Sequence, residues 1–142
     1  MDERDIEILK ALVKNGRASY VELSKKLKIT EAAVRKRVKK LETKGIVKGF
    51  TAIIDPATLG FHAVAVIGVD TVSDALMSTF EHVKNIRGAK YVALSSGDHM
   101  IIFEVWCKDQ QELSQVISKV KKIEGVTKVC PAILLKSREL VG

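Results

Sequence analysis

The stretch TEAAVRKRVKKLETKG, residues 30–45, decides how the first part of the chain folds. Read at ~3.6 residues per turn, it predicts an amphipathic helix with an apolar stripe and basic flanks. Thr30 is a suitable N-cap, and Gly45 suits the position just after the last turn. The stripe consists of Val34, Val38 and Leu41, and the flanks carry Arg35, Lys36, Lys39 and Lys40. We therefore expect one side of this helix to pack on a protein core and the other to face an anion.

Two shorter helical patterns precede this helix. Asp2 can cap the first, over residues 3–15, and Ser19 with Glu22 forms the S-x-x-E capping box of the second, over residues 19–27. The apolar positions of the first helix recur at helical spacing, at Ile6, Leu9, Leu12 and Val13. Only Lys28-Ile29 separates the second helix from Thr30. Three helices with a tight turn before the last are typical of a helix-turn-helix domain.

The positive charge of the chain is concentrated in the same region. Residues 1–50 contain 14 basic and 7 acidic residues, whereas residues 51–142 contain 10 of each. A localised positive field favours a polyanion, either nucleic acid or an anionic membrane. A membrane-surface helix needs an exposed apolar face with aromatic residues, and residues 25–48 contain no aromatic residue. A solvated basic surface helix is the alternative, but the helix-turn-helix pattern favours double-stranded DNA as the partner.

Several classes of protein are disfavoured by composition. The chain has no run of ~18 apolar residues and no signal-peptide pattern, so we expect a cytoplasmic protein with no membrane partner. Cys107 and Cys130 lack any CxxC partner, and His62, His82 and His99 do not have metal-ligand spacing. We therefore expect reduced thiols, no metal site, no cofactor and no catalytic residues, which means that the protein is not an enzyme.

The rest of the sequence predicts a second domain. Residues 46–54, IVKGFTAII, favour a strand, and residues 55–61 favour a hinge because Asp55-Pro56 and Leu59-Gly60 break the pattern. Strands are predicted over 63–71, 90–95, 100–107 and 126–135, with helices over 73–87 and from a cap at Asp109 to Gly125. This order is that of a ferredoxin-like βαββαβ domain. The predicted class is α+β, with a helix-turn-helix domain at 1–50, a strand and hinge at 51–61, and the ferredoxin-like domain at 62–142.

The predicted strands are apolar at nearly every position, as in AVAVIGV and MIIFEVW. Both faces of the sheet therefore need burial, but two helices can cover only one of them. A second copy of the sheet is the simplest cover, because a monomer would expose an apolar patch larger than soluble monomers tolerate. We expect a homodimer, which would also present two recognition helices to one face of a DNA duplex.

The sequence resembles the Lrp/AsnC family, also called feast/famine regulators, over essentially its whole length. The resemblance rests on DERDIEILKAL, on LSKKLKITEAAVRKRVKKLETKGIVKGFTAIIDPATLG, on SSGDHM and on IEGVTKVCPAILL. It implies a transcription regulator with an N-terminal helix-turn-helix, a hinge and a C-terminal domain that dimerises and often assembles dimers into tetramers or octamers. In many members this second domain senses amino acids.

The resemblance places the recognition helix at residues 30–43. Thr30, Ala32 and Arg35 are expected nearest the base edges, and the residues expected toward phosphates are Lys36, Arg37, Lys39 and Lys40. Arg37 lies closest to the apolar stripe, so a structural contact between helices is its alternative role. Lys25, Lys26 and Lys48 are more peripheral.

The resemblance also suggests an effector site at the turn formed by Ser96, Gly97, Asp98 and His99. Members that bind amino acids commonly have Gly-x-x-Asp there, but Met100 occupies the position of the aspartate in this chain. Asp98 is a candidate substitute, although an aspartate in a hairpin turn more often stabilises the turn itself. Amino-acid sensing, a different ligand and an effector-independent regulator all stay open.

Two other functions compete with that of a sequence-specific regulator, for which regulation of its own gene stays open. An architectural protein that binds DNA with little sequence preference would use the same charges. A siroheme decarboxylase is similar to this family in fold, but it would need basic groups in the second domain, where the net charge is zero.

Overall fold

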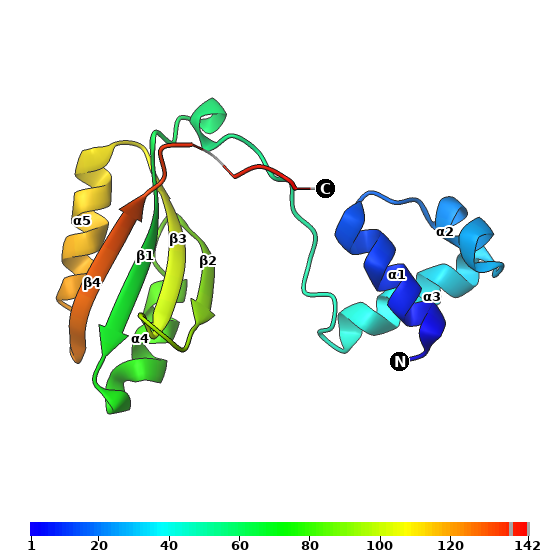
Figure 1. The fold of residues 1–142 in the computed structure, drawn as a ribbon, viewed down its shortest axis with the longest axis horizontal. Helices are drawn as coiled ribbons and strands as arrows, with labels where there is room; N and C mark the ends of the chain where they lie inside the picture. Colours follow the sequence, from blue (N-terminus) through cyan, green and yellow to red (C-terminus); the bar gives the residue numbers. More distant parts are fainter. Residues whose placement is uncertain (137, 142) are drawn as a thin grey trace. The chain divides into compact units, whose positions relative to one another are not determined.

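The computed structural model describes residues 1–136 and 138–141, which form two compact units. The first comprises Met1–Ile53 together with Leu140 and Val141, and the second comprises Ile54–Glu139. The division therefore falls inside the predicted linking stretch 51–61, and the second unit begins and ends earlier than the predicted range 62–142. Figure 1 traces both units along the chain, and each is described below by itself.

The first unit consists of three helices, α1 (Glu3–Lys14), α2 (Tyr20–Leu27) and α3 (Glu31–Thr43). Asp2 and Asp5 form a capping box at the start of α1, and Ser19 and Glu22 form one at the start of α2. The side chain of Thr30 accepts a hydrogen bond from the Ala33 N–H, 3.1 Å away, and begins α3. These caps confirm the predicted starts of all three helices.

The core of this unit is built around one buried residue of α1. Ile8 is fully buried and packs with Leu23 of α2 and with three residues of α3, Val34, Val38 and Leu41. The predicted stripe of α3 is confirmed. The predicted face of α1 was wrong in part, because Ile6 is exposed and Val13 is 89% exposed. The apolar residues of α1 fit two overlapping stripes, and packing against α2 and α3 selects the stripe that contains Ile8.

The strand predicted at 46–54 is absent from this part of the structure. After α3, the N–H groups of Ile46 and Val47 both donate to the carbonyl of Leu41, and residues 48–55 then run without regular structure. A branched and aromatic composition favours a strand only when a neighbouring strand supplies hydrogen bonds. The sheet of the structure, β1 to β4, does not include this segment, and Phe50 is 52% exposed.

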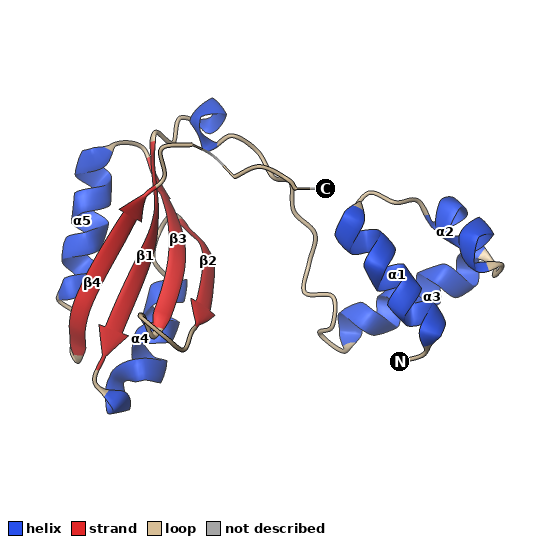
Figure 2. Ribbon diagram, viewed as in Figure 1, coloured by secondary structure: helices blue, strands red, loops and turns tan. Residues whose placement is uncertain are grey.

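The second unit is one four-stranded antiparallel sheet with two helices, as Figure 2 shows. A 3-10 turn, Pro56–Leu59, precedes it. The elements are β1 (Ala63–Thr71), a 3-10 turn (Ser73–Ala75), α4 (Leu76–Lys84), β2 (Ala89–Leu94), β3 (Ile101–Cys107), α5 (Gln110–Lys121) and β4 (Val126–Ile133). The strand order is β2-β3-β1-β4, which is the predicted ferredoxin-like arrangement.

The two faces of this sheet differ in what covers them. Alternate residues of β1 and β3 point toward α4 and α5 and are fully buried, among them Ile67, Val69 and Phe103. Val64, Val66 and Ile102 alternate with them, so they point to the opposite face, and they are half-buried. In the described chain both helices therefore lie on one face of the sheet, which leaves apolar side chains on the other.

Candidate nucleic-acid interface

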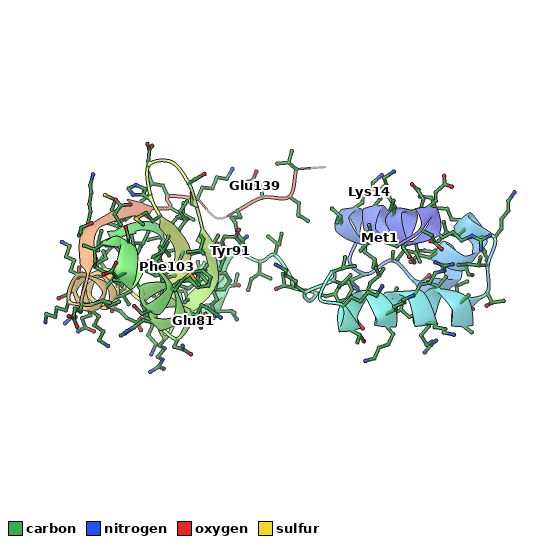
Figure 3. All side chains as sticks on the ribbon, turned by 90° about the horizontal axis from the view of Figure 1, so that it is seen from below. Met1, Lys14, Glu81, Tyr91, Phe103 and Glu139 are labelled. Carbon is green, nitrogen blue, oxygen red and sulfur yellow. The ribbon has the colours of Figure 1, made fainter. Side chains whose placement is uncertain are left out.

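The solvent-facing side of α3 carries most of the predicted DNA-binding residues. Burial of Val34, Val38 and Leu41 fixes how the helix is rotated. The residues left exposed are Thr30, Ala32, Arg35, Lys36, Lys39 and Lys40. Figure 3 shows α1 with Met1 and Lys14 labelled, and the side chains of α3 extending away from it. The helix therefore presents a basic surface to solvent, with its capped N-terminus next to Ala32.

Arg35 is held against the preceding helix of the motif. Its guanidinium carbon lies 5.6 Å from the centre of the Tyr20 ring on α2. A guanidinium over an aromatic face is attracted by the ring, and both groups lose some rotamer freedom. The contact limits the directions that Arg35 can take, while the side chain stays exposed.

The three lysines of this surface carry uncompensated charge. Within residues 1–136 and 138–141, the ion pairs of the structure do not include Lys36, Lys39 or Lys40. Flexible, unpaired ammonium groups on the exposed side of α3 suit phosphate oxygens, because a phosphate contact releases condensed counterions from the DNA.

Arg37 differs from its neighbours because it is already engaged. Its Nη1 donates to Asp2 Oδ2 at 2.7 Å and to Asp5 Oδ1 at 2.8 Å. The backbone N–H of the capping box and the bonds from Arg37 hold the pKa of both carboxyl groups below the ordinary value, and the carboxylates raise the pKa of Arg37. This geometry favours the structural role that the sequence left open for Arg37, rather than the phosphate contact.

The predicted effector residues do not converge on one point. Ser96, Gly97 and Asp98 are exposed, whereas His99 turns back toward β1, where its Nδ1 lies 3.4 Å from Asp70 Oδ2. A Cβ added at Gly68 would collide with the His99 ring, so the ring packs directly on the backbone of β1.

Sequence analysis missed Asp70, which anchors this turn. Its Oδ1 accepts a hydrogen bond from the Met100 N–H at 3.1 Å, so the Asp70 carboxylate lies against the backbone at the end of the turn. The only sequence signal was an aspartate at the end of an apolar strand. The role of Asp70 becomes visible only when β1 is seen to lie next to the turn that precedes β3.

Other kinds of site find little support in the described residues. They contain no group of three or more possible metal ligands, and no helix among them is long and apolar enough to cross a membrane. Cys107 is buried, and burial followed by the nearby Glu112 and Asp109 charges raises its pKa to about 11. It is therefore a protonated thiol at neutral pH and a poor nucleophile.

Comparisons with known proteins agree with this geometry. Residues 1–48 match the family described as winged helix-turn-helix DNA-binding. The chain is 49% identical over 137 residues to the HTH-type transcriptional regulator LrpA of Pyrococcus horikoshii, covering 96% of this chain and 97% of that protein.

Two solved structures share the fold over nearly the whole chain. The structure of Escherichia coli AsnC has a TM-score of 0.74 and 24% identity, with 100% of this chain and 97% of that chain covered. A Neisseria meningitidis transcriptional regulator solved as an L-Met complex has a TM-score of 0.76 and 25% identity, with 99% and 93% covered.

Proposed function

Since the chain belongs to the Lrp/AsnC family of DNA-binding transcription regulators, we propose that it reads a specific operator sequence through α3. Thr30, Ala32 and Arg35 lie nearest the base edges in this proposal, and Lys36, Lys39 and Lys40 bind phosphates. Arg37 is left out of the contact set. The supporting observation is the rotation of α3, which buries its apolar stripe and leaves these six residues exposed along the solvent-facing side of the helix.

We also propose that the regulator is a homodimer joined through the sheet face opposite α4 and α5. Val64, Val66 and Ile102 lie on that face as half-buried apolar side chains. A second copy of the sheet, packed at ~10 Å, would bury them. Two α3 helices could then address half-sites ~34 Å apart, and further assembly into tetramers or octamers is part of the same proposal.

An amino-acid effector at the turn 96–99 belongs to the proposal as well. The L-Met complex of the Neisseria relative supports the ligand class, and Asp70 supplies a carboxylate at the turn of this chain. The His99–Asp70 contact would open when the ammonium group of a ligand takes the carboxylate. The proposal includes no catalytic activity, so added siroheme should show no change of absorbance, and it places the protein in the cytoplasm with its DNA.

A salt-dependent titration tests the DNA-binding proposal. Genomic fragments, including the region upstream of the protein's own gene, are compared with scrambled DNA at several salt concentrations. A preference of ~10³-fold or more at physiological salt is expected for a specific regulator. Equal and steeply salt-sensitive binding to all fragments would instead indicate an architectural protein.

A matched pair of variants shows whether α3 is the contact surface. Lys36→Ala removes one charge from α3, and Lys121→Ala removes one from the exposed end of α5. We expect only Lys36→Ala to weaken operator binding. An equal loss for both would mean that binding depends on total charge and not on α3.

A further inference from the structure

Arg37 closes a network of hydrogen bonds at the start of α1. Asp2 N–H donates to Asp5 Oδ2 at 3.0 Å, and Asp5 N–H donates to Asp2 Oδ1 at 2.9 Å. The remaining oxygen of each carboxylate accepts from the same Nη1 of Arg37. Each carboxylate therefore bonds to both a backbone N–H of the cap and the guanidinium, and α1 is tied to α3 across more than thirty positions of sequence.

This network lies in the same surface as the proposed phosphate contacts. Asp2, Asp5 and Arg37 line one pocket together with Lys36 and Lys40 of α3. The Asp5 side chain is only 14% exposed and that of Arg37 is 27% exposed. Two carboxylates at this place would repel a DNA backbone, because charges within about a Debye length of ~8–10 Å act on each other with little screening.

We propose that Arg37 is a positioning residue for DNA binding, which offsets one of the two negative charges of Asp2 and Asp5 and fixes α1 against α3 without itself contacting DNA. The inference rests on the proposed function, in which α3 binds DNA. The position of Arg37 among the basic residues of α3 suggests a direct phosphate contact, and the inference replaces that role with an indirect one. The guanidinium of Arg37 faces Asp2 and Asp5, and its effect on phosphates comes from lowering the net negative charge of these two carboxylates.

A double-mutant cycle separates this role from a phosphate contact. The changes are Arg37→Met, which removes the charge, and the pair Asp2→Asn with Asp5→Asn. Asparagine keeps a side-chain oxygen that can accept the cap hydrogen bonds, so α1 keeps its start. Operator affinity of the full chain is measured by fluorescence anisotropy for the parent, the two partial variants and the triple variant.

We expect Arg37→Met to weaken binding about tenfold when the aspartates are present and by about threefold or less when both are asparagine. In the second background no carboxylate is left for the arginine to cancel. The Asp2→Asn, Asp5→Asn protein should bind at least as tightly as the parent. If Arg37 contacts a phosphate, Arg37→Met must cost an equal or larger factor in the asparagine background, and the salt slope must fall by about one. Either result overturns the inference.

Two controls keep the result interpretable. Circular dichroism at the assay temperature must show that each variant is folded, because a purely structural role lowers the melting temperature without changing the affinity of the folded protein. Arg35→Ala tests the proposed function independently. If Arg35→Ala weakens binding but the cycle is additive, only the inference fails. If the parent protein does not bind DNA, both the proposed function and the inference are refuted.

Discussion

Replacing Ile8 with alanine should destabilise the first unit more than any exposed change in α1. Ile8 is 0% exposed and contacts the buried cluster that Val34 and Val38 form on α3. Isoleucine-to-alanine changes at such positions cost about 2–5 kcal/mol, because transfer free energy is lost and a cavity is left. The first unit, Met1–Ile53 with the last residues of the chain, has a free energy of unfolding of about 3–8 kcal/mol at typical stability per residue. The change therefore removes between about a quarter of that stability and all of it.

Val13→Ala is the matched control in the same helix. Val13 is 89% exposed, so its truncation should change the free energy of unfolding by about 0.5 kcal/mol or less. The assay is urea unfolding followed by two signals. Far-UV circular dichroism reports the helices of both units, with the larger share of helical residues in α1, α2 and α3, and fluorescence of Trp106, the one tryptophan of the chain, reports the second unit alone.

We expect Ile8→Ala to move the part of the dichroism change that comes from the first unit to lower urea, and to leave the Trp106 transition unchanged. Equal midpoints for Ile8→Ala and Val13→Ala would refute the assignment of Ile8 to the centre of the core. A parallel shift of the Trp106 signal would show that the two units unfold together, which would contradict their treatment as separate folding units.

Three further predictions concern DNA, assembly and pH. Arg35→Ala, at a proposed base contact, should weaken operator binding by about 1–3 kcal/mol, and Lys36→Ala, at a proposed phosphate contact, should weaken binding to all sequences about equally and reduce the salt slope by about one, with folding intact by circular dichroism; unchanged affinity in both would place the reading face elsewhere. Ile102→Asp should yield monomers or an unfolded second unit in light scattering, and a well-folded dimer would contradict the sheet-face interface. Asp2 and Asp5 have pKa values below 3.8 in the folded protein. Their contribution to stability is therefore complete above about pH 5 and lost as the pH falls through the lowered values. Acid unfolding of the double asparagine variant, followed by circular dichroism, should show a smaller loss than the parent, and an identical loss would contradict the assigned pairing.

Local signals in the sequence were sufficient for most of the secondary structure. The structure confirms three predicted N-caps, Ser19, Thr30 and Asp109. They were predictable because the hydrogen bond that a cap makes reaches only two or three residues along the chain. The strand at 63–71 and the order of elements after it were likewise readable, because each pattern lies within one short segment. The class of the fold follows from that order.

Predictions that depended on a distant partner were the ones that needed the structure. The segment 46–54 has the composition of a strand but no neighbouring strand in the described chain, and Val13 fits the helical spacing of α1 but lies outside its core. In both cases the residue types were compatible with the predicted structure, but the neighbouring elements do not pack against these residues.

The candidate site divides in the same way. By itself, the sequence determined that α3 is basic, that it buries Val34, Val38 and Leu41, and that Arg35, Lys36, Lys39 and Lys40 lie off that stripe, since helical periodicity alone relates these positions. Only the tertiary structure decided that Arg37 faces Asp2 and Asp5, and that Asp70 anchors the turn at His99. These partners are about thirty positions apart in sequence. The position of a charged residue in the sequence does not show which distant residue its side chain will face in the fold.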